Sequence, residues 1–182
     1  SLYGILKAGG VFVILAGSLK SAKLRYILEN SGANVLITHT SKAKVVGDAL
    51  SEGSGGRKII WVGPGSRIPK EISGFSLSWD EIFSNFDEKI STEESYSRLP
   101  RCIDVDLATL IYTSGSTGEP KGVMSTHYNM ISAARSIIQY IGNIEDDVIL
   151  DVLPLSFDYG LYQVIMSFMF GGTVVLEKSF LY

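Results

Sequence analysis

The densest group of reactive side chains lies in one short loop. Between Tyr112 and Gly122 the sequence reads Tyr-Thr-Ser-Gly-Ser-Thr-Gly-Glu-Pro-Lys-Gly. Gly115 and Gly118 can adopt backbone conformations that turn several N–H groups toward one point, which suits anionic oxygens. Four hydroxyls and one ammonium add donors to this loop, from Thr113, Ser114, Ser116, Thr117 and Lys121. This combination of donors indicates phosphate binding.

A polar hairpin turn is the simpler interpretation, since Gly and Ser are common in turns. An ordinary turn, however, does not need four hydroxyls together with Gly-x-x-Gly-x-x-Lys, so we favour phosphate binding. The loop is not a Walker motif, because no Gly-Lys pair occurs in the chain. It also lacks the Gly-x-Gly-x-x-Gly pattern of dinucleotide-binding loops.

Strands and helices alternate in the first half of the chain. Short apolar runs predict strands at Val11–Leu15, Asn34–Thr38 and Lys58–Val62. Between them, helical spacing predicts a helix from Ser21 that Gly32 stops, and a second one over Lys42–Leu50. Apolar strands separated by helices are typical of parallel βαβ units that are covered on both faces.

The second half repeats this alternation after a connector of weak pattern, residues 63–104, which contains one short expected helix at Asp80–Phe86. Strands are expected before the loop at Leu107–Thr113 and after it at Gly122–Ser125, followed by a helix around Met130–Ile141. A strand at Val148–Leu153, a helix that carries Leu161, Val164, Ile165 and Phe168, and a last strand at Thr173–Glu177 complete the expected elements. We therefore expect an α/β fold, with strands flanked by helices in two linked lobes. The lobes are expected at residues 1–104, connector included, and at residues 105–182.

Composition narrows the functional classes. The chain has 182 residues, a net charge of −3 and 46% hydrophobic residues, which fits a globular protein and supplies no basic field for nucleic acid. Its single cysteine, Cys102, excludes an internal disulfide, so a reducing, cytoplasmic setting is expected. The uncharged stretch Tyr159–Leu176 is long enough to span a membrane, but Gly171-Gly172 divides it, and buried core is the favoured interpretation. We expect neither a membrane span nor a nucleic-acid partner.

At the loop the sequence resembles a known family. Tyr112–Val123 closely matches the phosphate-loop signature of adenylate-forming enzymes, which include acyl-CoA synthetases, luciferases and the adenylation domains of nonribosomal peptide synthetases. Leu6–Val13 and Leu24–Ala33 are similar to early segments of these enzymes, and Leu153–Leu161 resembles their acid-pocket motif. The resemblance covers essentially the whole chain in the right order. It implies part of the large N-terminal domain of an AMP-forming acid–thiol ligase.

The resemblance also implies roles for particular residues. The phosphates of ATP would be bound by residues of the loop: Thr113, Ser114, Gly115, Ser116, Thr117, Gly118 and Lys121. Phe157 and Asp158 would border the acid, although Phe157 also fits a plain core position. In amino-acid-activating relatives an aspartate at the Asp158 position pairs with the substrate ammonium, whereas Asp158 could equally cap the following helix. We expect the cap, and hence a fatty or other simple acid as substrate; an amino acid is the alternative.

Cofactors and partners follow from the same resemblance. ATP and a carboxylic acid would be the substrates, Mg²⁺ would screen the phosphates, and CoA or a carrier phosphopantetheine would accept the acyl group. No cluster in the sequence has metal-ligand spacing, and the family's magnesium-associated glutamate, ribose-binding aspartate and catalytic lysine have no counterpart here. We therefore expect a fragment, inactive alone, whose partner is the remainder of the parent protein. A non-catalytic nucleotide- or phosphate-binding module is the rival hypothesis.

Overall fold

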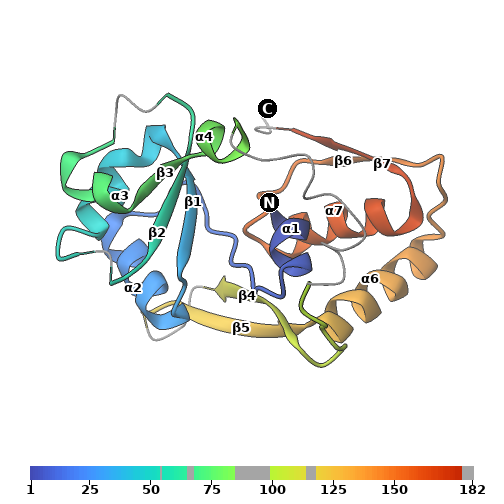
Figure 1. Ribbon diagram of the computed structural model, residues 1–182. Helices are drawn as coiled ribbons and strands as arrows, with labels where there is room; N and C mark the ends of the chain where they lie inside the picture. Colours follow the sequence, from blue (N-terminus) through green and yellow to red (C-terminus); the bar gives the residue numbers. More distant parts are fainter. Residues whose placement is uncertain (54, 65–67, 85–98, 114–117, 178–182) are drawn as a thin grey trace. The chain divides into compact units, whose positions relative to one another are not determined.

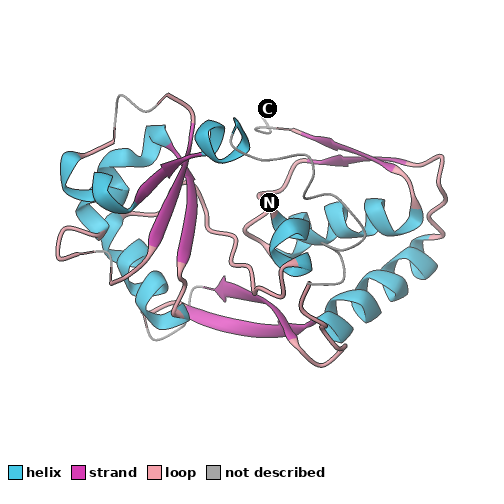
Figure 2. Ribbon diagram, viewed as in Figure 1, coloured by secondary structure: helices cyan, strands magenta, loops and turns pink. Residues whose placement is uncertain are grey.

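The computed structural model describes residues 1–53, 55–64, 68–84, 99–113 and 118–177 (Figures 1 and 2). The chain divides into two compact units, one formed by Ser1–Gly17 together with Leu99–Tyr182 and the other by Ser18–Arg98. The expected lobe boundary at residue 104 falls near the second of these divisions. The first 17 residues group with the later part of the chain.

The unit of residues 18–98 is built on a parallel three-stranded sheet in the order β1 (Val35–His39), β2 (Lys58–Val62) and β3 (Ser76–Ser78). The predicted βαβ arrangement is confirmed, because β1 pairs with β2 in parallel over five residues each. The helical segments of this unit are α2, η1, α3, η3 and α4, at Ser21–Ser31, Thr40–Lys42, Ala43–Ala49, Lys70–Phe75 and Trp79–Ser84.

Helix α2 shows why these residues fold as the spacing predicts. Its buried side chains, Leu24, Ile27 and Leu28, recur every three or four residues and so share one face. Gly32 ends the helix with φ of +64°, a left-handed conformation that glycine adopts without steric cost. The core of this unit also contains Ile59 and Trp61 of β2, which are almost fully buried.

The other unit contains α1 (Leu2–Lys7), an antiparallel hairpin, and a parallel strand pair. The hairpin joins β4 (Leu107–Thr113) to β5 (Lys121–Thr126), and α6 (His127–Ile141) follows it. The remaining elements are β6, α7 and β7, at Val148–Asp151, Asp158–Phe170 and Thr173–Leu176. Helix α7 contacts both β6 and β7 on one side and α6 on the other (Figure 1).

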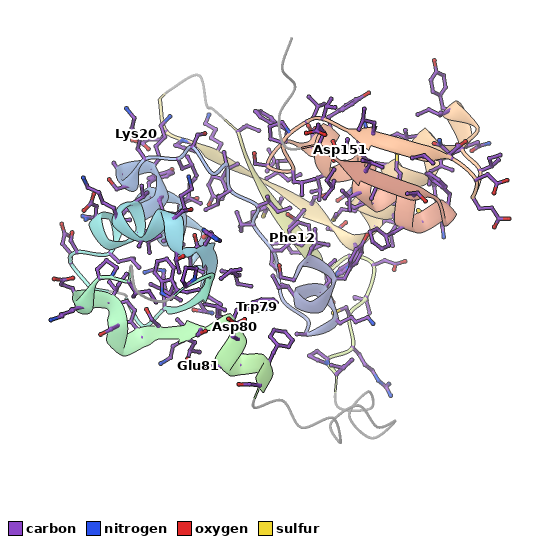
Figure 3. All side chains as sticks on the ribbon, turned by 90° about the horizontal axis from the view of Figure 1, so that it is seen from above. Phe12, Lys20, Trp79, Asp80, Glu81 and Asp151 are labelled. Carbon is purple, nitrogen blue, oxygen red and sulfur yellow. The ribbon has the colours of Figure 1, made fainter. Side chains whose placement is uncertain are left out.

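The expected strand at Val11–Leu15 is wrong. Only Phe12 forms a β-bridge, to Thr109 of β4. The Phe12 amide donates to the Ala108 carbonyl at 3.1 Å, and the Phe12 carbonyl accepts from the Leu110 amide and the Thr109 hydroxyl. Phe12 is buried among Ala108, Met130 and Leu161 of the same core (Figure 3). Phe12 therefore makes an isolated bridge to β4, while Leu2, Ile5, Leu6 and Ile14 pack against the same core.

The helices of the structure bear on the expected absence of a membrane span. Within the described part of the chain, no helix combines the length and the apolar character needed to cross a bilayer. The uncharged stretch considered in the sequence is divided between α7 and β7, with Gly171 in the left-handed conformation that ends α7.

Candidate functional site: the β4–β5 hairpin and the turn before α7

The hairpin places the two ends of the predicted phosphate loop side by side. Thr113 is the last residue of β4 and pairs in register with Lys121, the first residue of β5. Both residues are exposed, and Gly118 between them has φ of +98°, which favours glycine. Ser114, Gly115, Ser116 and Thr117 lie outside the described residues. Of the predicted phosphate ligands, the structure therefore describes Thr113, Gly118 and Lys121.

Lys121 can offer its charge to a ligand. No carboxylate within the described residues forms an ion pair with its ammonium group, although Glu119 lies only two positions away in the sequence. The neighbouring Gly122 gives the ring of Tyr112 room, since a Cβ there would lie 3.2 Å from Tyr112 Cζ. A lysine with a free ammonium beside an exposed hydroxyl is a suitable contact for an anionic oxygen.

Strand β4 is a firm support for this loop. Ala108 and Thr109 are almost fully buried, and the Thr109 hydroxyl donates to the Phe12 carbonyl at 2.9 Å. The loop begins four residues after this anchored point. Fixing one end of the loop in the core limits the motion of the donors that it carries.

The predicted acid-binding residues lie in the same unit as the hairpin. Phe157 precedes α7 and its side chain is 62% exposed, so the plain core interpretation is wrong. Phe157 lines a narrow crevice, without room for a water molecule, together with Leu110 and Ile111 of β4. The crevice is also lined by Phe12, Ile14, Thr109, Leu155, Ser156 and Leu161. The acid-binding candidate Phe157 is thus packed beside the strand that ends at Thr113.

Asp158 is not the helix cap that we expected. Helix α7 begins at Asp158, Phe157 occupies the cap position, and no side chain caps the helix. Asp158 Oδ1 accepts from the Tyr159 amide at 2.8 Å, which satisfies one N–H group of the first turn. The carboxylate is exposed at the positive end of the helix dipole, where a negative charge is favourable. Its second oxygen remains available for a substrate group.

Tyr162 lies near both Asp158 and strand β5, and this placement was missed in the sequence. It lies one turn after Asp158 on α7, close enough to the side chain of Ser125 on β5 for that side chain to influence its pKa. Burial raises the pKa of Tyr162; the Ser125 side chain opposes this rise, and the nearby charge of Asp158 adds to it. The i, i+4 spacing of Asp158 and Tyr162 was visible in the sequence, whereas the contact across to Ser125 was not.

The described residues contain no candidate metal cage. Among them, no group of three or more His, Cys, Asp or Glu side chains could hold an ion. The expected Mg²⁺ therefore has no protein cage within this part of the chain.

Comparison with known proteins identifies the family. A model of the AMP-binding enzyme family matches residues 1–181, so the chain belongs to that family. Bacitracin synthase 1 of Bacillus licheniformis is 32% identical over 180 residues, which cover 98% of this chain and 3% of that protein. The mitochondrial malonate–CoA ligase of Xenopus laevis is 28% identical over 185 residues, which cover 98% of this chain and 28% of the ligase.

A solved structure agrees with the fold. The anthranilate CoA ligase AuaEII in complex with anthranoyl-AMP superposes with a TM-score of 0.81 at 25% identity, covering 96% of this chain and 32% of the ligase. The chain thus spans less than a third of each of these three relatives. The expected α/β fold is confirmed, and the expected resemblance to peptide-synthetase adenylation domains and acyl-CoA ligases is confirmed as well.

Proposed function

We propose that the protein containing this chain activates a carboxylic acid with ATP to form an acyl-adenylate. The observation that carries the proposal is that Phe157 lines one narrow crevice with Leu110 and Ile111 of β4, the strand that ends at Thr113 in the phosphate loop. We place the acid at Phe157 and ATP at the loop, so that both reactants lie near the end of this strand. Membership of the AMP-binding enzyme family supports the same reaction.

In this reaction a carboxylate oxygen of the acid attacks the α-phosphorus of ATP. The bond from the α-phosphorus to the bridging oxygen breaks, and pyrophosphate leaves with the electron pair. The β- and γ-phosphates are bound by Lys121, by the Thr113 hydroxyl and by Gly118. The predicted ligands Ser114, Gly115, Ser116 and Thr117 of the same loop complete this set. Donors fixed at that position stabilise the charge that accumulates on the leaving group.

The proposal also includes the transfer of the acyl group to a thiol and a role for Mg²⁺. A thiol, from CoA or a carrier phosphopantetheine, attacks the acyl carbon, and AMP leaves. Mg²⁺ bound to the phosphates would neutralise part of their charge. The remainder of the parent protein supplies the groups that hold ribose, metal and thiol. The reducing cytoplasm is the proposed setting, with Cys102 as a free thiol.

The class of acid is decided at Asp158. We expected a fatty or other simple acid partly because Asp158 would be occupied as a helix cap, and its side chain does not cap the helix. Tyr159 and Tyr162 still supply apolar surface for an acyl chain. An amino acid is the second candidate, favoured by the exposed Asp158 carboxylate, of which only Oδ1 is engaged by the Tyr159 amide among the described residues. The free oxygen of Asp158 could pair with a substrate ammonium group.

Pyrophosphate exchange on the full-length protein separates these candidates. The protein is incubated with ATP, labelled pyrophosphate and either octanoate or one of a panel of amino acids. Exchange with octanoate that survives Asp158→Asn supports the simple acid. Exchange with an amino acid that is lost in Asp158→Asn supports the second candidate. ATP binding by calorimetry without exchange for any acid would instead identify a non-catalytic nucleotide-binding module.

A further inference from the structure

The turn between β6 and α7 is pressed directly against the helix that follows it. Gly160 lies in the first turn of α7 and is buried. A Cβ at Gly160 would lie 2.7 Å from the carbonyl oxygens of both Leu153 and Pro154, closer than real Cβ contacts allow. The backbone of the turn therefore occupies the space that any other residue at position 160 would fill.

A second contact holds the same turn from the strand side. Asp151 ends β6 and is 2% exposed (Figure 3). Its Oδ1 accepts from the Leu153 amide at 3.2 Å, while Oδ2 has no hydrogen-bond partner in the part of the chain that the structure describes. Burying a carboxylate with one oxygen unpaired costs free energy. We therefore attribute to the Asp151 carboxylate a functional role in holding this turn.

The end of the turn is where the proposed acid-binding residues begin. The Phe157 amide donates to the Pro154 carbonyl at 3.0 Å, and the Leu161 amide donates to the Phe157 carbonyl at 3.0 Å. A displacement of Leu153 or Pro154 is therefore transmitted to Phe157, which lines a narrow crevice with Leu110 and Ile111. The β4–β5 hairpin has a separate anchor, because the Thr109 hydroxyl donates to the Phe12 carbonyl.

We propose that Gly160 and Asp151 are positioning residues that clamp the Leu153–Phe157 turn against α7 and so set where Phe157 and Asp158 meet the acid. This inference rests on the proposed function and deepens it, because it separates the residues that position the acid from those that bind ATP. Neither Gly160 nor Asp151 needs to touch a substrate. A methyl group at position 160 must push the turn away from α7, while the loop at Thr113 and Lys121 stays in place.

The decisive variant is Gly160→Ala in the full-length protein. Binding residues must be held to within about 0.5 Å, so we expect the KM for the acid to rise roughly tenfold or more. The Kd for ATP, measured by calorimetry without acid, should stay within about twofold of the unmodified protein. Gly4→Ala is the matched control, because it adds the same methyl group to a helical glycine with no atom within 4 Å.

Asp151 supplies a second test that does not depend on Gly160→Ala folding. Asp151→Ala removes the acceptor for the Leu153 amide and should raise the KM for the acid, again without changing the Kd for ATP. Asp151→Asn keeps an acceptor oxygen at the Oδ1 position and should restore the KM. Circular dichroism and thermal unfolding of each variant identify those that fail to fold.

The outcomes distinguish this inference from the proposed function. Selective loss of acid use in Gly160→Ala and Asp151→Ala, with rescue in Asp151→Asn, supports the clamp. Unchanged acid KM in a folded variant, or equal losses toward acid and ATP, overturns it while leaving acid activation intact. If the unmodified protein shows no exchange with any acid, the proposed function fails. A crystal structure of Gly160→Ala then still tests the clamp, which predicts a displaced Phe157 ring.

Discussion

Lys121 is the one cationic side chain of the predicted phosphate loop, and its contribution should be specific to ATP. Lys121→Ala removes a charge-assisted hydrogen bond to phosphate worth about 1.5–3 kcal/mol, so kcat/KM for ATP should fall by roughly 10- to 150-fold. Lys121 is exposed, so the free energy of unfolding should change by no more than about 0.5 kcal/mol.

The matched control for this loss is Lys23→Ala, which removes an exposed lysine from α2. Steady-state kinetics and thermal unfolding are measured on both variants. If Lys121→Ala and Lys23→Ala use ATP equally well, Lys121 does not bind phosphate.

The titration of the Tyr162 phenol should make the stability of the protein depend on pH. Burial raises the pKa of Tyr162 above its ordinary value of 10.0, so the folded protein holds the neutral phenol more strongly than the unfolded chain does. This contribution is fully present below pH 10 and is lost as the pH rises through the higher pKa of the folded state. Stability should therefore fall more steeply above pH 10 in the unmodified protein than in Tyr162→Phe.

The charge of Asp158 can be tested in the same titration. It is the smallest of the three influences on Tyr162 and raises its pKa, so Asp158→Asn should lower that pKa toward the ordinary value. Nuclear magnetic resonance of ring-labelled tyrosine follows this one residue through the titration. A Tyr162 pKa that does not respond to Asp158→Asn would place the two side chains out of electrostatic reach.

At the scale of elements, α6 shows how a local hydrogen-bond pattern fixes where a helix begins. Thr126 Oγ1 accepts from the Asn129 amide at 3.1 Å, and Asn129 Oδ1 accepts from the Thr126 amide at 3.1 Å. Thr126→Ala removes half of this capping box and should cost about 1 kcal/mol of stability. Thr126→Ser keeps the hydroxyl and should cost much less. Urea unfolding of the two variants gives the comparison, and equal losses would mean that the cap contributes nothing.

The sequence predicted the elements with strong local signals. β2 and β4 occur with the predicted bounds, and α2 ends at Gly32 as its composition indicates. Strand β3 was missed because it has only three residues, Ser-Leu-Ser, and forms through pairing with β2. The strand expected at Val11–Leu15 failed for the converse reason, since its apolar residues reach the core without a partner strand beyond Phe12.

In the candidate site, too, local sequence signals predicted some features and tertiary contacts determined the others. Residue types and spacing were enough to single out Thr113, Gly118, Lys121, Phe157 and Asp158. The contacts around them depend on tertiary structure: Tyr162 of α7 lies near Ser125 of β5, and Gly160 presses on carbonyl groups that no sequence pattern marks. The helix cap expected at Asp158 was wrong, because Asp158 is itself the first residue of α7 and Phe157 occupies the cap position.

At the scale of the whole molecule, we expect the chain to supply only part of what the proposed reaction needs. It spans 28% of the malonate–CoA ligase and 32% of the anthranilate ligase that it matches. Positioning of reactants is worth about 7–11 kcal/mol, so the isolated 182-residue chain should give no acid-dependent pyrophosphate exchange above background. Circular dichroism confirms folding in the same sample. Exchange by the folded, isolated chain would mean that the groups it needs lie within these residues.

The most direct test of acid activation follows one oxygen atom. The full-length protein is given ATP, a thiol acceptor and its acid labelled with ¹⁸O in the carboxylate, and the AMP is analysed by mass spectrometry. If the carboxylate attacks the α-phosphorus, the bridging oxygen stays with phosphorus when the thiol takes the acyl group, so AMP gains one ¹⁸O atom. AMP without label, or label in inorganic phosphate instead, would contradict adenylation of the acid.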